Sequence, residues 1–230
     1  MCCISGSYDK QRLIKLVESG YHRSGHSFSI TVIRNNVIQY LSRALVTVSP
    51  SELVDAINNT DCDDSDYILV HQQAPTTSAR SLASVHPSYA KLSHCKTYLW
   101  HNGIIKDESI KFLRDLYNLD LTWDTALLHE AVHELVDYQE QATINEIFGG
   151  FACVYVTDKL PGLHLFRNTV CPLFLNKDLD ISSIKRDDSF ILLPDGKVHV
   201  VDLKSKSVSI STEFTSCESP YMFLSDLVRT

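Results

Sequence analysis

The chain opens with MCCISG (residues 1–6), and this stretch carries the first chemical signal of the sequence. If Met1 is removed, as commonly happens before a small second residue, Cys2 carries both a thiol and a free α-amino group. These groups titrate near ~8.5 and ~8 in model peptides, so one residue supplies a nucleophile and a base within reach of each other. That pairing is the basis of covalent acyl-transfer catalysis. The alternative, in which Cys2 is an ordinary first residue, stays open on these residues alone.

Composition narrows the classes of protein that the chain can belong to. It has 230 residues, enough for one large core or two modest domains. The 21 basic and 28 acidic residues give a net charge of −7, which argues against a dedicated nucleic-acid binder. The seven cysteines form no CxxC pair, no signal peptide is recognisable, and no apolar run approaches the ~20 residues of a membrane helix. We therefore expect a cytoplasmic protein without a membrane segment.

Hydrophobic periodicity and capping signals predict an α+β chain with strands early and late and helices in the middle. We expect helices near 9–19, 50–58, 107–117, 124–140 and 142–147, and strands near 28–34, 37–41, 67–71, 96–100, 151–157, 163–167, 189–193, 197–202 and 206–210. Gly20 is expected to cap the first helix, and residues 101–103 to form a tight turn. Residues 74–94 are expected to form an irregular loop, and Asp195-Gly196 a hairpin turn.

Eight short segments follow one another along the chain in an order that is typical of one family. They are Cys2–Gly6, Arg23–Ser27, His71–Thr76, Ser84–Pro87, His101–Gly103, Asp124–Thr125, Gly149–Ala152 and Leu165–Asn168. In this order they resemble the motifs of the class II glutamine amidotransferases, which are N-terminal-nucleophile (Ntn) hydrolases. The resemblance spans most of residues 2–192.

The resemblance implies a four-layer αββα Ntn-hydrolase sandwich in a single domain. We expect this domain to cover residues 2–202, with residues 203–230 forming an extension that packs on it. The implied reaction is hydrolysis of the side-chain amide of glutamine, with ammonia passed to a partner synthase or transferase subunit. No cofactor and no nucleic-acid partner are expected.

The resemblance also implies the catalytic residues. Cys2 is expected to attack the amide, with its own α-amine as the proton carrier. The side chain of Asn102 and the backbone N–H of Gly103 are expected to form the oxyanion hole, where losing one donor typically costs ~10²–10³ in rate.

The substrate-binding residues implied by the resemblance include one clear departure from the family. Asp124 is expected to bind the α-ammonium group of glutamine, Arg23 to order the loop around the nucleophile, and Thr76 and His86 to line the pocket. The family has an arginine for the substrate α-carboxylate where this chain has Gln73, which offers neither a charge nor a bidentate fork. Either Arg80 replaces that arginine, or the substrate lacks the carboxylate. Cys3 and His26 also differ from the family, which has Gly and Asp there.

A different class of enzyme is suggested by His129-Glu130-Ala131-Val132-His133. This HExxH pattern places two histidines on one helix face, where zinc could bind with Glu130 as the base and Glu146 as a third ligand. The simpler interpretation is two histidines on a solvated helix flank, and we expect no resident metal. Three hypotheses therefore remain: a glutamine amidotransferase subunit, an Ntn amidase acting on another amide, and a zinc peptidase.

Overall fold

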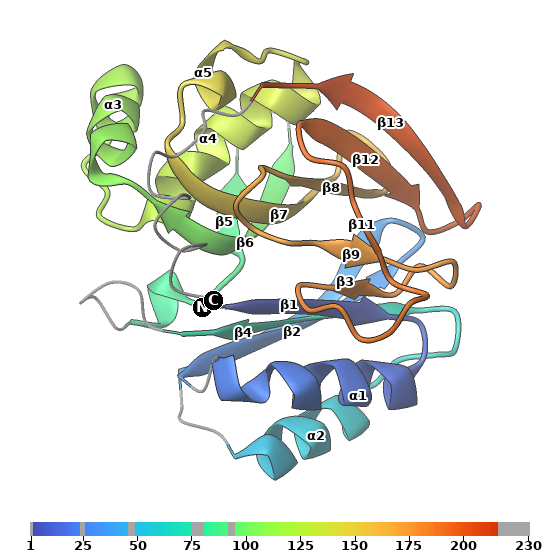
Figure 1. Ribbon diagram of the computed structural model, residues 1–230. Helices are drawn as coiled ribbons and strands as arrows, with labels where there is room; N and C mark the ends of the chain where they lie inside the picture. Colours follow the sequence, from blue (N-terminus) through green and yellow to red (C-terminus); the bar gives the residue numbers. More distant parts are fainter. Residues whose placement is uncertain (1, 24–25, 46–48, 75–80, 92–94, 216–230) are drawn as a thin grey trace, which may run out of the picture.

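Two antiparallel β-sheets, stacked face to face, form the centre of the protein (Figure 1). The computed structural model describes residues 2–23, 26–45, 49–74, 81–91 and 95–215. Sheet A contains, in spatial order, β11 (Ile191–Leu192), β9 (Phe174–Leu175), β10 (Ile181–Ser182), β1 (Cys3–Ser7), β4 (Tyr67–Gln73), β2 (Ser27–Arg34) and β3 (Val37–Ala44). Sheet B contains β13 (Ser207–Glu213), β12 (Lys197–Asp202), β8 (Leu163–Arg167), β7 (Gly149–Thr157), β6 (Lys96–Ile105) and β5 (Ser88–Lys91).

Helices cover the outer face of each sheet. On sheet A lie α1 (Lys10–Gly20) and α2 (Pro50–Asn58). On the side of sheet B lie α3 (Asp107–Tyr117), α4 (Asp124–Asp137) and α5 (Ala142–Asn145). Two short 3₁₀ turns, η1 (Tyr21–Arg23) and η2 (Leu82–Ser84), complete the described elements. The predicted α+β fold with four αββα layers is therefore confirmed.

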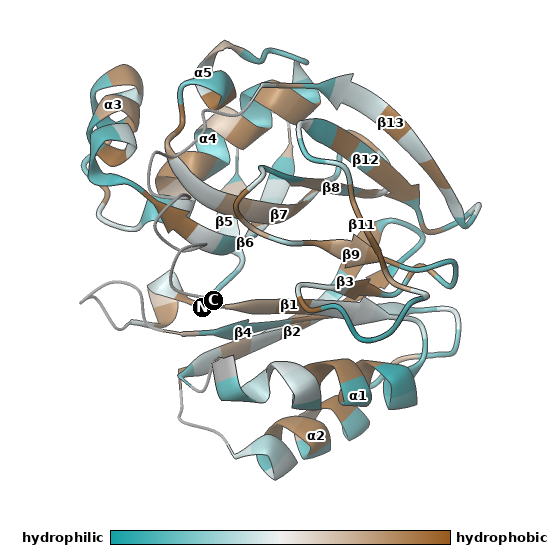
Figure 2. Cartoon of the chain, in the orientation of Figure 1, coloured by the Kyte–Doolittle hydropathy of each residue, from teal (hydrophilic) through white to brown (hydrophobic). Residues whose placement is uncertain are grey.

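The two-residue period of β7 explains how one strand serves two cores. Ala152, Val154 and Val156 face sheet A and belong to the apolar cluster between the sheets. Phe151 and Tyr155, which alternate with them, belong to the cluster beneath α4. Because both faces of β7 are buried, its sequence is apolar almost throughout, as the brown ribbon in Figure 2 shows.

Local sequence chemistry sets the helix starts as predicted. Ser49 caps α2 through a reciprocal capping box with Glu52, and Pro50 occupies the first turn, where a missing N–H costs nothing. Asp9 caps α1 by accepting a hydrogen bond from the backbone N–H of Arg12 at 2.9 Å.

The prediction for Gly20 is wrong. This residue is the last of α1 rather than a left-handed cap, and the chain continues directly into η1. A Cβ atom at Gly20 would lie 2.6 Å from the Cys3 sulfur. The glycine is therefore needed for the close approach of α1 to β1.

Two predicted turns are also wrong, because long-range strand pairing overrides the local signal. Residues 101–103 lie inside β6, where Gly103 is paired opposite Phe151 of β7. Asp195-Gly196 does not close a hairpin, since β11 belongs to sheet A and β12 to sheet B. Its backbone instead bonds to Arg167 and Phe214.

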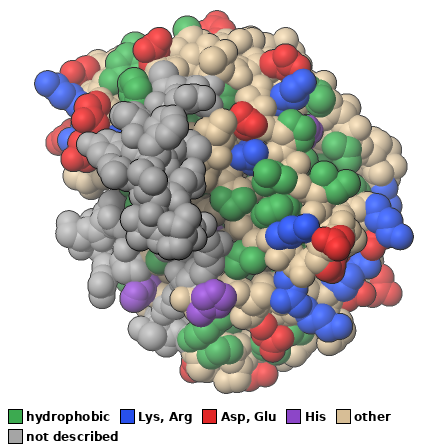
Figure 3. Space-filling view, in the orientation of Figure 1, with side chains coloured by type: hydrophobic (Ala, Val, Ile, Leu, Met, Phe, Trp, Pro, Cys, Tyr) green, Lys and Arg blue, Asp and Glu red, His purple; other side chains and the backbone are tan. Residues whose placement is uncertain are grey.

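The remaining segments differ in part from expectation. The described part of 74–94 contains η2 and the strand β5, so it is not one irregular loop. Residues 207–213 pair with β12 as β13, while the division of the chain at residue 202 stays a prediction. No helix among the described residues is long and apolar enough to cross a membrane. On the face in Figure 3, basic and acidic side chains are interspersed rather than gathered into one basic field.

Candidate active site

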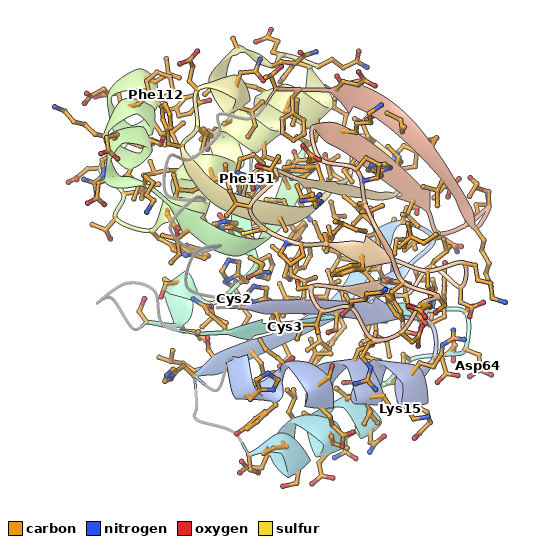
Figure 4. All side chains as sticks on the ribbon, viewed as in Figure 1. Cys2, Cys3, Lys15, Asp64, Phe112 and Phe151 are labelled. Atoms are coloured by element: carbon orange, nitrogen blue, oxygen red, sulfur yellow. The ribbon has the colours of Figure 1, made fainter. Side chains whose placement is uncertain are left out.

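Cys2 lies at the start of β1, where the two sheets meet below β6 (Figure 4). Its side chain is buried, and its sulfur lies 4.0 Å from the carbonyl oxygen of Ala74 at the end of β4. Burial raises the pKa of the Cys2 thiol to about 11, and the negative charge of Asp124 acts in the same direction. A thiol in this environment is protonated at neutral pH, so it needs a base in order to act as a nucleophile.

The proposed oxyanion-hole residues come from β6, on the facing sheet. Gly103 has a φ of +152°, and a Cβ atom there would collide with the carbonyl oxygen of Gly150 on β7. No other residue can therefore occupy this position without moving the strand. Asn102 is only 3% exposed, and no hydrogen bond joins its side-chain amide to another of the described residues. Its amide donors are thus free to meet a ligand.

Asp124 is the first residue of α4 and lies beside this end of β6. Its carboxylate accepts hydrogen bonds from the backbone N–H of Thr125 at 2.7 Å and of Ile105 at 3.3 Å. The side chain is buried, and the positive end of the helix dipole favours its negative charge. The fold therefore brings Cys2, β6 and Asp124 to one end of the interface between the sheets.

A cluster of three buried histidines surrounds Thr125 next to these groups. The Thr125 hydroxyl lies 3.1 Å from His86 Nε2 and 3.1 Å from His101 Nδ1. The His71 ring packs against the His86 ring with 3.9 Å between centroids, and its Nε2 donates to the carbonyl oxygen of His101 at 3.1 Å. Burial lowers the pKa of all three, to about 3 for His71. The three histidines therefore contribute no positive charge beside Asp124 at neutral pH.

Gln73 lies at the end of β4, and its side chain bonds within the protein. Its Nε2 donates to the carbonyl oxygen of Ser84 at 3.0 Å, and its Oε1 accepts from the Ser27 hydroxyl at 3.3 Å. The same oxygen lies 3.1 Å from His86 Nδ1. The amide thus holds the segment at 84–86 against β4.

The other predicted substrate residues are placed only in part. Arg23 ends η1, and its side chain is not described. Thr76 and Arg80 lie outside the described residues.

The HExxH pattern does not assemble the zinc site that its spacing suggests. Among the described residues, the ligand atoms of His129, Glu130 and His133 do not converge, and Glu146 does not join them. His129 is buried and its Nδ1 lies 2.9 Å from the Ser88 hydroxyl, so it is no solvated flank either. The described residues therefore give the zinc-peptidase hypothesis no geometric support.

Sequence reasoning left several residues of these regions without a role. His101 and Thr125 stand inside segments that resemble the family, yet only the structure joins them to His71 and His86. The proximity of Cys95 to His133 and Asp137 was also missed. The four-residue spacing of His133 and Asp137 was a usable signal, because it puts both side chains on one helix face.

Comparisons with known proteins agree with the fold. No protein-family profile matches the sequence, and no curated protein matches it. The structure is similar to glutamine phosphoribosylpyrophosphate amidotransferase from B. subtilis, with a TM-score of 0.63 and 11% identity over 92% of this chain. It is also similar to a structure described as the allosteric regulatory enzyme of purine biosynthesis, with a TM-score of 0.66 and 12% identity over 92% of this chain.

These similarities define the class of fold and nothing finer. The four-layer αββα sandwich expected from the motifs is the fold that this chain shares with these two structures. The chain spans about half of each neighbour, 49% of the length in both cases.

Proposed function

We propose that this protein is an amidohydrolase of the glutamine amidotransferase type, with Cys2 as its N-terminal nucleophile. The observation that carries the proposal is the convergence of Cys2, the Asn102-Gly103 segment and Asp124 at one end of the sheet interface. The shared fold and the ordered motifs support the same reaction class.

The proposed reaction takes place in two steps. The sulfur of Cys2 attacks the side-chain amide carbon of glutamine, and the thiol proton passes to the α-amine of the same residue. The tetrahedral oxyanion receives hydrogen bonds from the Asn102 amide and the Gly103 N–H. The α-ammonium returns the proton to the leaving nitrogen, ammonia departs, and a thioester remains. Water then cleaves the thioester, which releases glutamate and restores the thiol.

Because the pKa of the Cys2 thiol is raised, the reaction needs a base, and the α-amine of Cys2 serves as that base. A buried thiol with a pKa of about 11 does not ionise by itself near neutral pH. Processing that frees the α-amine supplies a base with a pKa near ~8 next to the sulfur. The proposal therefore requires a mature protein that begins at Cys2.

Glutamine is the substrate that Asp124 fits, because a buried carboxylate pairs with the α-ammonium group of an amino acid. The use of the ammonia by a partner synthase or transferase subunit is part of the proposal. So is a reducing, cytoplasmic location, which the free thiols of the six described cysteines favour.

One observation favours a second candidate, an Ntn amidase acting on an amide without an α-carboxylate. The Gln73 side chain replaces the arginine of the family, and its polar atoms already bond to Ser84, Ser27 and His86. In this candidate Cys2 keeps the same role and only the substrate changes.

The decisive experiment is an ammonia-release assay on the mature protein beside Cys2→Ala. We expect intact mass to show the loss of Met1, and Cys2→Ala to lower turnover of glutamine by about 10³-fold or more. Asn102→Ala should lower kcat about 10²–10³-fold with little change in KM. Cys62→Ser, which removes a half-buried thiol near α2, is the matched control and should remain active.

Two results would contradict the main proposal in different ways. A mature chain that retains Met1 excludes both Ntn candidates. Inert glutamine, together with turnover of another amide that Cys2→Ala abolishes, selects the second candidate.

A further inference from the structure

A second cluster of reactive side chains lies at the opposite end of α4 from the proposed active site. Cys95 immediately precedes β6, whereas His133 and Asp137 lie one turn apart at the end of α4. The Cys95 sulfur, one ring nitrogen of His133 and one carboxylate oxygen of Asp137 all lie within 4.8 Å of one another. His133 Nδ1 lies 2.7 Å from Asp137 Oδ2, and the Cys95 sulfur lies 3.9 Å from the same oxygen.

The Asp137 carboxylate in this cluster is buried and only partly hydrogen-bonded. The Asp137 side chain is 0% exposed, and its Oδ1 has no hydrogen-bond partner among the described residues. A carboxylate at a helix C-terminus also faces the negative end of the helix dipole. Lys159, which lies beside this turn, donates to the backbone carbonyl of Asp137 at 3.3 Å rather than to the carboxylate. A buried carboxylate in this position needs a cation or a proton.

We propose that Cys95, His133 and Asp137 bind one zinc ion, with water as the fourth ligand. Thiolate, imidazole and carboxylate are the three donor types that zinc takes from proteins, and three protein ligands with one open position is an established zinc geometry. Thiolate disfavours magnesium and calcium, which select oxygen ligands.

Two of the three ligand-to-ligand distances can be compared directly with those of a zinc site. Two ligands of a tetrahedral zinc ion, bound at 2.0–2.3 Å, lie about 3.3–3.8 Å apart. The sulfur-to-oxygen distance of 3.9 Å already nearly meets this spacing. The nitrogen-to-oxygen distance of 2.7 Å must open by roughly half an ångström, because the ion replaces the hydrogen bond between His133 and Asp137.

The proton balance of binding is simple. The Cys95 thiol releases its proton to solvent as the sulfur binds zinc, and His133 binds through the lone pair of Nδ1 with its ring proton on Nε2. One thiolate and one carboxylate then balance the two positive charges of the ion, so the buried site is neutral. Tyr155 keeps its place beside the cluster, with its hydroxyl 3.3 Å from Asp137 Oδ2.

Zinc bound at this site has a consequence for stability. The ion would tie the residue that precedes β6 to the last turn of α4, two segments that are 38 or more positions apart in the sequence. Because zinc binds the folded arrangement, it should raise the thermal stability of the protein as its concentration rises. The site is separate from Cys2, so this inference does not depend on the proposed amidohydrolase activity.

The test is zinc binding by the full chain after removal of metals with a chelator. We expect one equivalent of zinc, and with cobalt(II) in its place a thiolate-to-metal charge-transfer absorption. Cys95→Ser should remove that absorption and weaken zinc binding by about 100-fold or more, and Asp137→Asn should weaken it by about 10-fold or more. Cys62→Ser and Cys2→Ala are the matched thiol controls and should bind as the unchanged chain does.

Circular dichroism of each variant shows whether it is folded at the temperature of the titration. Asp137→Asn keeps the shape of the side chain, so it tests the site even if Cys95→Ser fails to fold. The proposal is overturned if the metal-free chain takes up no stoichiometric zinc. It is equally overturned if folded Cys95→Ser or Asp137→Asn binds zinc as tightly as the unchanged chain, or if Cys2→Ala removes the absorption.

Discussion

The two ends of α4 each hold a buried aspartate, but the surroundings of the two carboxylates are opposite. Asp124 begins the helix and accepts hydrogen bonds from the backbone N–H groups of Thr125 and Ile105. Asp137 ends the helix, and among the described residues its carboxylate contacts only side chains, those of His133, Tyr155 and Cys95. Burial raises the pKa of Asp137. The free carbonyl groups at the end of a helix carry partial negative charge, which also disfavours the Asp137 carboxylate.

The difference shows how one helix can carry two kinds of site. At its N-terminus, peptide N–H groups stabilise the Asp124 charge, which leaves a fixed anion available to a cationic substrate group. At its C-terminus, nothing in the backbone stabilises a negative charge, so the charge of Asp137 has to be balanced by a bound cation or a proton. Four substitutions along α4 and its contacts separate these roles.

The largest effect is expected for Asp124→Asn compared with Asp137→Asn. The first should lower kcat/KM for glutamine by about 10²-fold, because it removes one charge of a buried ion pair with the substrate ammonium. It should leave zinc affinity within about twofold. Asp137→Asn should weaken zinc binding and leave kcat/KM for glutamine within about twofold. Steady-state ammonia release and zinc titration on the same two proteins measure both quantities.

The asparagine oxygen can still accept the Thr125 N–H, so Asp124→Asn should fold normally. If both variants lose activity and zinc binding together, the helix acts as one unit and the comparison between its ends fails. If Asp124→Asn acts on glutamine as the unchanged chain does, Asp124 is not the ammonium partner.

The sequence predicted the elements that depend on local chemistry. The helix over 50–58 followed from Ser49, Pro50 and Glu52, whose capping interactions involve only neighbours in the chain. The tight turn expected at residues 101–103 failed because the residues that decide it, 149–153, lie more than 40 positions away and extend β6 by pairing. A glycine in a strand and a glycine in a turn give the same local signal.

The same physical limit applies to the two candidate sites. Cys2, Asn102 and Asp124 were proposed from motifs, and the structure adds how near they lie to one another. The histidine cluster around Thr125 and the group at Cys95, His133 and Asp137 each join segments whose proximity depends on sheet packing. Periodicity on one helix could indicate that His133 and Asp137 share a face, but it could not indicate that Cys95 meets them.

A smaller effect is expected for His71, one of the buried histidines near Asp124. It concerns the free energy of unfolding rather than the reaction rate. The unfolded chain protonates His71 near ~6.5, whereas burial lowers the pKa of His71 to about 3 in the folded protein. Protons therefore favour the unfolded state throughout that interval. The stability due to neutral His71 is fully present above pH ~6.5 and is lost by about 1.4 kcal/mol per pH unit as the pH falls toward 3.

Replacing His71 by Gln removes this titration while keeping a donor for the carbonyl oxygen of His101. Urea unfolding at pH 6.5 and pH 5 should show a smaller loss of stability in His71→Gln than in the unchanged chain, by about 2 kcal/mol over that range. His129 is a matched internal control, since its pKa is also lowered to about 3 by burial and it remains in both proteins. Equal losses in the two proteins would show that His71 is not held neutral in the fold.

The smallest effect is expected midway between the two ends of α4. Glu130 is the residue that a zinc peptidase would use as its base, and removing such a base typically lowers the rate ~10²–10⁴-fold. Among the described residues, the ligand atoms of His129 and His133 do not converge with it, and Glu130 supplies no atom to the group of Cys95, His133 and Asp137. Glu130→Gln should therefore leave both ammonia release and zinc affinity within about twofold, because an uncharged side chain of the same shape replaces it. A large loss of zinc binding in this variant would move the metal site back to the HExxH pattern. A large loss of ammonia release would show that the active site extends along α4 as far as Glu130. The two ends of the helix would then not carry separate sites.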